Sequence, residues 1–245
     1  MKIVISSNIH YVIPLNILLQ SLKKHNNIFP IIIVKSNSID EKICYENNLL
    51  YINTIENNYE YTSFNMIKKY MNDSRIYDTS YLFLHDTCIV GPKFIQSLNY
   101  YEKILSINDL FMSPIRNSNI ILLHSSIFNN FDYFYENLSK KEACDLEGNI
   151  NVRNFSNISN YGKINLLKPR FYVGFFDVYN TKYPRKIFHY PDFDIYKTVL
   201  HNKFGDFDPI NKVKQIYKNS SFVKRHKREK LHFKNQEVKL HFHIT

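Results

Sequence analysis

Short apolar runs and helical stretches alternate along the chain from residue 2 to residue 84. Residues 2–6, 31–34, 49–52 and 81–84 are rich in Ile, Leu, Val or aromatic residues, and each run is short enough for a buried strand. Strands that alternate with helices at this spacing predict a parallel, doubly wound sheet with right-handed crossovers. The expected fold class is therefore α/β, with a mostly parallel central sheet flanked by helices.

Three helices are expected between these strands. Pro14 suits the first turn of a helix, and apolar residues then recur at helical spacing. Ser38 and Glu41 have the Ser-x-x-Glu spacing of a capping box, which predicts a helix after the second strand. Thr62 or Ser63 is expected to cap a third helix that continues to residue 71.

The pattern becomes less regular after the fourth strand. Pro92 is expected to begin a helix, residues 111–112 and 119–123 to form strands, and residues 127–140 to form a further helix. Residues 149–162 are polar and rich in Asn, so they are expected to form a long loop.

The composition favours a folded, soluble protein. Hydrophobic residues make up 44% of the 245 residues and aromatic residues 16%, with a mean hydropathy of -0.35. The apolar runs are too short to span a bilayer, and the first residues lack a signal-peptide core, so a cytoplasmic location is expected. Cys44, Cys88 and Cys144 are odd in number and widely spaced, which supports neither a disulfide framework nor a zinc site.

The formal net charge of +10 suits an anionic partner, such as a nucleic acid, a membrane surface or a phosphorylated small molecule. A general enrichment in Lys, Asn, Ile and Tyr explains the charge equally well. A basic run at residues 224–228 is the strongest local signal for nucleic acid, but it comes with no RNP motif, zinc pattern or helix-turn-helix. A nucleic-acid partner is therefore not expected.

The fourth apolar run ends in a carboxylate, which a buried strand does not need for packing. Asp86 follows the run, and Gly91 and Pro92 stop the segment five residues later. In open α/β sheets the ligand crevice lies outside the carboxyl ends of the strands, so Asp86 is expected at its mouth. The chain has only five glycines and neither a GxGxxG nor a GxxxxGK[ST] motif, which argues against dinucleotide enzymes and P-loop NTPases.

The segment Tyr-Leu-Phe-Leu-His-Asp-Thr-Cys-Ile-Val-Gly at residues 81–91 resembles the D-x-D segment of GT-A-type glycosyltransferases, in which a strand ends at a metal-binding acidic pair. The first strand, the Pro14 helix and the helix at 64–70 are similar to the N-terminal half of that family. The resemblance implies a single GT-A-like, Rossmann-like domain over residues 1–245. Residues 1–125 would bind the nucleotide sugar, 126–221 would form the acceptor side, and 222–245 would be a basic tail.

The segment at residues 81–91 lacks one of the two acidic residues of the D-x-D motif. Asp86 aligns with the second acidic position and Leu84 with the first, so the motif here is L-x-D. The resemblance implies transfer of a sugar from a nucleoside-diphosphate sugar, expected to be a UDP-sugar, to a glycan, protein or lipid acceptor. It also implies Mn2+ or Mg2+, held by Asp86 and the substrate phosphates. Strand alternation puts His85 on the opposite face, and Cys88 suits a buried apolar position.

The resemblance also implies a set of site residues. The loop after the first strand would contact the nucleoside, residues on the third helix would lie nearby, and later polar residues would face the donor. These donor-binding candidates are Ser6, Ser7, Asn8, Ser63, Lys68, Asp86, Asn119 and Arg185. The candidate catalytic residues, from which a base would come, are Glu147, Asp145 and Asp194. His241 or His243 is either a late metal ligand, as in some retaining relatives, or, as the commoner explanation, an incidental His in the basic tail.

Two other functions stay open. The missing acid suits a protein of the same fold that binds nucleotide sugars without turning them over, and the net charge suits a nucleic-acid binder. For Asp86 itself, the separate alternative is a purely structural role as the residue that caps the turn after its strand.

Overall fold

The computed structural model describes residues 1–26, 29–107, 120–130, 138–139, 142, 171–173, 187–190 and 193–198. All of them belong to the first of two compact units, Met1–Gly205; the second is Asp206–Thr245. The expected division of residues 1–245 into a donor half, an acceptor half and a tail stays a prediction. Within the described part of the chain, no helix is long and apolar enough to cross a membrane.

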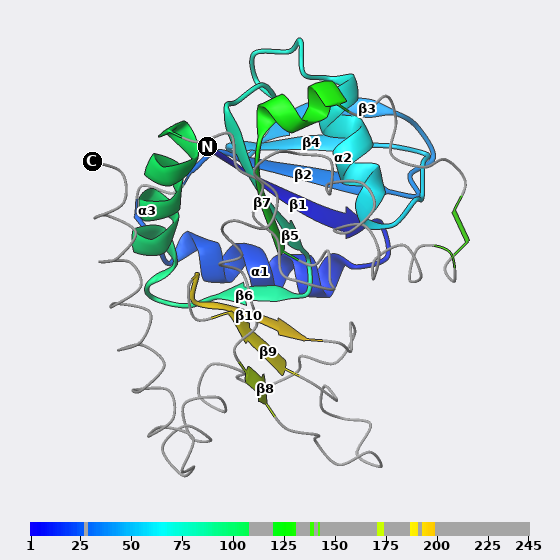
Figure 1. Ribbon diagram of the computed structural model, residues 1–245. Coiled ribbons are helices and arrows are strands. Elements are labelled where there is room, and N and C mark those ends of the chain that lie inside the picture. The colour runs from blue at the N-terminus through cyan, green and yellow to red at the C-terminus, as the bar shows by residue number, and fades with distance from the viewer. Residues whose placement is uncertain are drawn as a thin grey trace, which may run out of the picture. The chain divides into compact units, whose positions relative to one another are not determined.

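The main sheet has six strands in the order β3-β4-β2-β1-β5-β7 (Figure 1). The four central strands β4, β2, β1 and β5 are parallel, and an antiparallel strand lies at each edge. The expected α/β fold with a mostly parallel sheet is confirmed. The strands are β1 (Lys2–Asn8), β2 (Ile31–Ser36), β3 (Lys42–Glu46), β4 (Leu49–Asn53), β5 (Ser80–His85) and β7 (Ile120–His124).

The path of the chain creates a switch point between β1 and β5. From β1 the chain adds β2 and then β4 on one side, and it returns to place β5 on the other side of β1. In open α/β sheets the ligand crevice lies at such a point, outside the carboxyl ends of the two strands. The residues that follow β1 and β5 are therefore the first place to look for a site.

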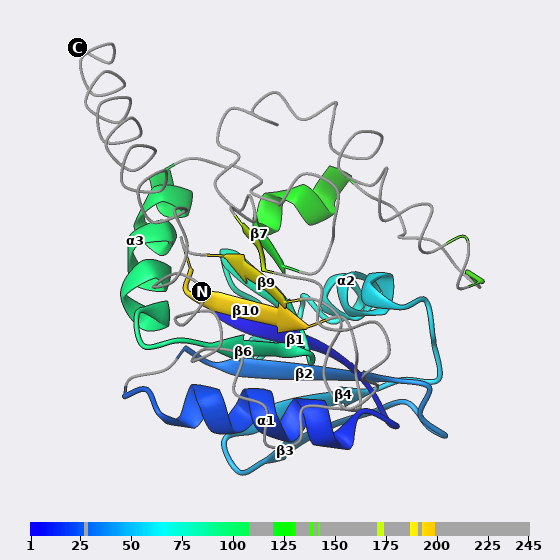
Figure 2. The ribbon, with the colours of Figure 1, turned by 90° about the horizontal axis from the view of Figure 1, so that it is seen from below.

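Helices bury both faces of the main sheet. Ile3 and Ile5 of β1 pack with Leu18 of α1 (Val12–Lys23), whereas Val4 between them packs with Phe64 of α2 (Glu60–Lys69). This alternation is what a strand buried on both faces requires. The helix α1 runs alongside β1 and β2 (Figure 2), and α3 (Phe94–Ile107) contributes to the same core as α1.

The helix predicted from the capping box of Ser38 and Glu41 is wrong. Residues 38–41 form an irregular connection, and a strand, β3, follows immediately. It pairs antiparallel with β4 across a turn at Asn47 and Asn48, whose φ angles are 50° and 63°. Two Asn residues in the left-handed region are typical of a tight hairpin turn, and this turn chemistry overrides the capping pattern.

The expected cap of α2 is also displaced. The helix begins at Glu60, so Thr62 and Ser63 lie inside its first turns, and the N-cap is Tyr59, which makes no side-chain cap. The Thr62 hydroxyl instead accepts a hydrogen bond of 2.8 Å from the backbone N–H of Asn58. Ser63 is therefore available for a contact outside its own helix.

Later elements agree in part with the sequence. The helix expected from Pro92 is α3, and the strand expected at 119–123 is β7, which pairs antiparallel with β5. At the start of the helix expected over 127–140, the structure has a 3-10 helix, η1 (Ser125–Asn130). The rest of that prediction, apart from residues 138 and 139, falls outside the described residues, as do those for 111–112 and 149–162.

A second, antiparallel sheet, which the sequence did not reveal, has the strand order β6-β10-β9-β8. Val90 and Ile195, paired across β6 and β10, join the core that contains α1 and α3. Phe193 stacks on Tyr101 of α3 with ring centroids 4.4 Å apart. The strands are β6 (Cys88–Val90), β8 (Phe171–Val173), β9 (Ile187–Tyr190) and β10 (Ile195–Thr198).

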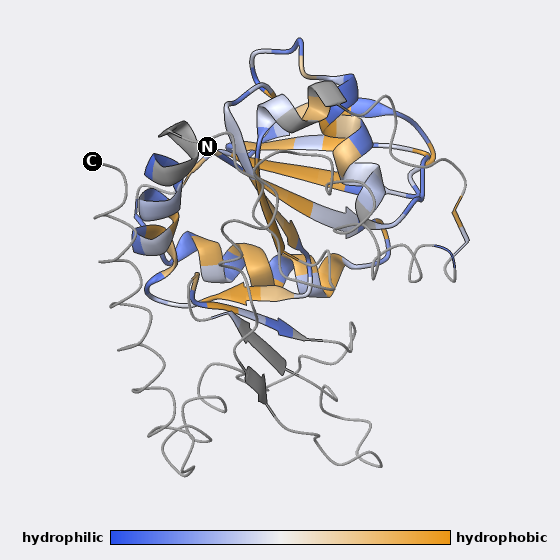
Figure 3. Ribbon diagram, in the orientation of Figure 1, coloured by the Kyte–Doolittle hydropathy of each residue, from blue (hydrophilic) through white to orange (hydrophobic). Residues whose placement is uncertain are grey.

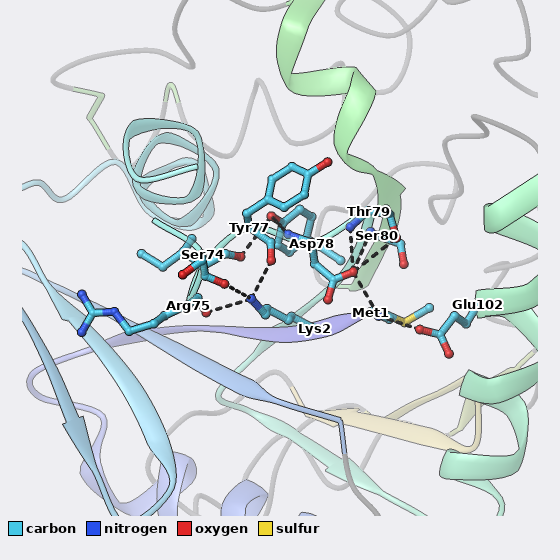
Figure 4. A network of polar contacts seen from close by, with 11 residues as sticks. Met1, Lys2, Ser74, Arg75, Tyr77, Asp78, Thr79, Ser80 and Glu102 are labelled. Atoms are coloured by element: carbon cyan, nitrogen blue, oxygen red, sulfur yellow. Dashed lines mark hydrogen bonds and ion pairs between the residues drawn. The ribbon is translucent and has the colours of Figure 1, made fainter. Parts of the chain in front are cut away.

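Polar contacts hold the start of β1 beside the segment that leads into β5 (Figure 4). The Lys2 ammonium donates to the backbone carbonyls of Arg75 at 2.8 Å and Tyr77 at 2.6 Å. Burial lowers the pKa of Lys2, and the charge of Asp78 acts in the opposite direction. The amino group of Met1 lies 3.1 Å from the Asp78 carboxylate. These contacts fix β1 and β5 side by side at the end opposite to the switch point.

Asp194 fastens β10 to the start of α3. Its backbone φ is 53°, its carbonyl accepts the Gly91 N–H at 2.7 Å, and its carboxylate accepts the Lys93 N–H at 2.9 Å and the Tyr196 hydroxyl at 3.1 Å. A Cβ added to Gly91 would lie 2.6 Å from the Asp194 Oδ1 and would overlap the other oxygen. Glycine at position 91 is thus required by the close approach of this carboxylate.

Gly91→Ala should lower the free energy of unfolding by about 1–3 kcal/mol, because the added methyl group forces the Asp194 carboxylate off its hydrogen-bond partners. Urea denaturation followed by circular dichroism measures this loss. In an Asp194→Gly background, where the carboxylate is gone and the left-handed φ is easily adopted, the same substitution should cost clearly less. An equal cost in both backgrounds would show that the two residues do not interact.

Candidate functional site

The central strands of the main sheet are apolar along most of their length, and β1 becomes polar toward its carboxyl end. Figure 3 shows β1 changing from orange to pale blue toward its arrowhead, where Ser6, Ser7 and Asn8 lie. The parallel register pairs Ser6 with His85, so Ser7 and Asp86 follow as the next neighbours across the two strands. Polar side chains from both strands thus meet at the switch point.

Asp86 is the charged residue of this edge. Its backbone N–H donates to the Ser6 carbonyl at 3.1 Å, and its Oδ2 accepts the Ser7 hydroxyl at 2.9 Å. Its side chain is buried, with 4% of the residue exposed. Leu84, which stands at the first acidic position of the resemblance, is fully buried in the core shared with α1.

Ser6 points to the opposite face from Ser7, because successive side chains of a strand alternate. Its hydroxyl lies 2.6 Å from that of Ser63 on α2. The two predicted serines of β1 therefore serve different contacts, one with the helix layer and one with Asp86. His85 pairs with Ser6 in the register and so lies on the α2 face, as expected.

A second polar group extends from Asn8 toward β2. The Asn8 amide donates to the Ser36 hydroxyl at 3.2 Å, and its carbonyl oxygen accepts the His10 N–H at 3.0 Å. The Ser36 hydroxyl in turn donates to the Ser7 carbonyl at 3.1 Å. These bonds shape the loop after β1 and connect it to the end of β2, and Ser36 is a member that the sequence did not single out.

Lys197 brings a positive charge to Asp86 from the second sheet. Antiparallel pairing puts Lys197 of β10 opposite Cys88 of β6, close to the turn that follows β5. Its ammonium donates to the Thr87 hydroxyl, and the residue is only 4% exposed. The local sequence does not mark Lys197, because its place depends on a strand pairing between segments more than a hundred residues apart.

Burial dominates the electrostatics of the carboxylate. It raises the pKa of Asp86 from 3.8 to about 6, and the charge of Lys197 and the hydrogen bond from Ser7 oppose this rise. Burial also raises the pKa of the Cys88 thiol to about 12, so Cys88 is not a thiolate at neutral pH. Cys88 therefore behaves as the buried apolar residue that the sequence suggested.

The side chains described around Asp86 do not fit a resident divalent ion. Mn2+ and Mg2+ prefer several oxygen ligands, including one or two carboxylates. Here the neighbours of the single carboxylate are a serine hydroxyl that donates to it and a lysine ammonium, which repels a metal ion. Among the described residues no group of three or more His, Cys, Asp or Glu side chains is arranged to hold a metal.

Two other predicted residues lie away from Asp86. Lys68 lies near the C-terminal end of α2. Its neighbour Lys69 contacts Glu41, which directly precedes the edge strand β3, and three strands separate β3 from β5. Asp194 is at the Gly91 end of β6, whereas Lys197 is at the Thr87 end. The contacts of Asp194 account for a structural role, and its catalytic role stays a prediction.

Several candidates fall outside the described residues, so their roles stay predictions. They are Glu147, Asp145, Asn119, Arg185, His241 and His243.

No family model matches this chain, and no curated protein matches it. It is similar to solved structures of LgtC, one an active-site mutant (TM-score 0.39, 12% identity over 60% of this chain and 69% of LgtC). Another is described as a galactosyltransferase in complex with donor and acceptor sugar analogs (TM-score 0.37, 11% identity, 60% and 70%). The glycosyltransferase GlyE of Streptococcus pneumoniae TIGR4 is also similar (TM-score 0.35, 12% identity), and this chain covers 40% of it. These TM-scores all lie below 0.5 and support no inference about function.

The raised pKa of Asp86 predicts a pH-dependent stability. Since the folded pKa of about 6 exceeds the ordinary value of 3.8, the folded state holds the proton more tightly, and this stabilisation is lost as the pH rises from about 4 to about 6. Relative to wild type, Asp86→Asn should therefore gain about 2 kcal/mol of stability between pH 4 and pH 7. Urea denaturation at several pH values measures the difference.

Asp73→Asn is the matched control. A hydrogen bond from Arg75 lowers the pKa of Asp73 to about 2, so Asp73 ionises below this pH range in the folded state and mostly below it in the unfolded state. Its stability difference from wild type should change little between pH 4 and pH 7. The Asp86 prediction is wrong if both variants keep a constant difference over that range.

Proposed function

We propose that this chain transfers a sugar from a nucleoside-diphosphate sugar, expected to be a UDP-sugar, to a hydroxyl group of a glycan, protein or lipid acceptor. The observation that carries the proposal is the buried Asp86 carboxylate at the β1–β5 switch point, held by Ser7 across the two strand ends. This is where open α/β sheets bind nucleotides. It is also where residues 81–91 resemble the D-x-D segment of GT-A-type glycosyltransferases.

A structural role alone is a poor explanation of Asp86. A buried carboxylate with a raised pKa costs stability at neutral pH, and such groups concentrate at functional sites. Leu82 and Leu84 of the same strand follow the ordinary rule and are fully buried apolar residues. The departure from that rule coincides with the carboxyl end of the strand, which is where open α/β sheets bind ligands.

In the proposed reaction Asp86 binds the donor. Its carboxylate accepts hydrogen bonds from hydroxyl groups of the donor, and Ser7 and the Ser6 carbonyl hold it in a fixed orientation. Asn8 and the loop after β1 would line the nucleoside. The acceptor proton needs a carboxylate base, for which Glu147, Asp145 and Asp194 stay the candidates. The cytoplasmic location stays a prediction, as does Mn2+ or Mg2+, which would need ligands beyond the side chains described around Asp86.

The proposal predicts that purified protein releases a nucleoside diphosphate from at least one of a panel of UDP-, GDP- and dTDP-sugars, assayed with and without Mn2+. Asp86→Asn should reduce kcat/KM by about 100-fold or more, because it removes the charge that orients the donor while keeping the shape of the side chain. Asp73→Asn, at an exposed loop, should leave kcat/KM unchanged. Circular dichroism confirms that each variant is folded.

The outcomes separate the three functions. Nucleotide-sugar binding by calorimetry without any product would favour the inactive binding protein of the same fold. Binding to DNA or RNA that falls steeply with salt, with no response to nucleotide sugars, would favour the nucleic-acid binder. Full activity of Asp86→Asn would remove Asp86 from the mechanism.

A further inference from the structure

A donor diphosphate cannot bind beside Asp86 without a compensating positive charge. A carboxylate and a diphosphate repel each other, and in a buried site the repulsion is stronger than in water. The leaving group also gains negative charge at the bridging oxygen as the glycosidic bond breaks. The site therefore needs a cation, and in the resembled family a metal held by two acids supplies it.

Leu84, which replaces the first acid of the metal-binding pattern, is part of the apolar core. Leu84 is fully buried among Leu82, Ile5 and the α1 side chains. An acid at this position would point into the apolar core rather than toward the crevice. Among the described residues, Asp86 is thus the one carboxylate at the end of β5.

The structure provides a cation of its own at the same place. Lys197 shares a face of β10 with Ile195, which points into the α1 core, and its ammonium extends to Thr87, directly after Asp86. The charge of Lys197 also acts on Asp86, whose pKa it lowers against the effect of burial. Two opposite charges thus lie near each other at the switch point.

Stability alone does not account for this arrangement. Each residue is 4% exposed, and removing both charges from water costs about as much as their attraction returns. An apolar pair of similar size would pack at this position at no such cost. A pair of opposite charges at the switch point of the sheet is better explained by a ligand that carries both hydroxyl groups and negative charge.

We propose that Lys197 takes the place of the divalent cation, so that a nucleoside diphosphate binds at this site without metal. This inference rests on the proposed function. The bond between the anomeric carbon and the diphosphate oxygen breaks, and its electron pair stays on that oxygen, where the Lys197 ammonium stabilises it. The acceptor oxygen forms the new bond to the anomeric carbon and gives its proton to a carboxylate base.

The test measures binding of UDP, GDP and dTDP by isothermal titration calorimetry, in EDTA and in Mn2+. Wild type should bind at least one of them with the same Kd, within about twofold, in both buffers. In EDTA, Lys197→Met should weaken that binding by about tenfold or more, and Lys197→Arg should retain most of it. Lys42→Met, on the exposed edge strand β3, controls for the loss of one positive charge from the whole protein.

If Lys197→Met does not fold, because Asp86 is left buried without its cation, the double variant Lys197→Met/Asp86→Asn restores neutrality. It should fold and should bind no nucleoside diphosphate, whereas Asp86→Asn alone should keep metal-independent binding through Lys197. Equal binding by these two variants would overturn the role of Lys197.

Wild-type binding that requires Mn2+ and disappears in EDTA would overturn the inference while leaving the proposed function intact. Unchanged binding by Lys197→Met would overturn it as well. Absence of binding in both buffers, with no turnover of any sugar nucleotide, would instead remove the proposed function and this inference together.

Discussion

Burial of the main sheet on both faces is the constraint on which the rest of the structure depends. With α1 and α3 on one face and α2 on the other, every side chain in the middle of β1 and β5 must be apolar. Polar groups are tolerated only where these strands end. The two-sided core therefore confines the chemistry of this half of the chain to the edge where Ser7 and Asp86 meet.

The switch in strand order makes that edge usable. Because β2 and β5 lie on opposite sides of β1, the carboxyl ends of β1 and β5 meet at the point where the strand order reverses, which is where open α/β sheets bind ligands. The contacts of Lys2 with the segment before β5 fix the two strands at their other end. The distance between the Ser7 and Asp86 side chains is thus set by the sheet itself rather than by loops.

Most of the first sheet was predictable because hydrophobic periodicity is a local signal. The four parallel strands and the helices after Pro14 and Pro92 follow from it directly. The helix predicted from the capping box at Ser38 and Glu41 was wrong because a two-residue Asn turn, which is an equally local signal, stabilises a hairpin instead. Within the site, Ser7 and Asp86 were predicted from their places at the ends of strands. That Ser6 contacts Ser63 whereas Ser7 contacts Asp86 depends on the face to which each side chain points.

The sequence by itself determined the α/β class, the apolar strands and the single carboxylate at the end of the fourth of them, since each depends on neighbours within a few residues. Only the tertiary structure decided which charge stands beside that carboxylate. The pairing of β10 with β6 brings Lys197 to Thr87, directly after Asp86, and a pairing between distant segments leaves no periodic trace in either one. Long-range strand pairing depends on the complementarity of whole surfaces, so the cation of this site became visible only in the folded chain.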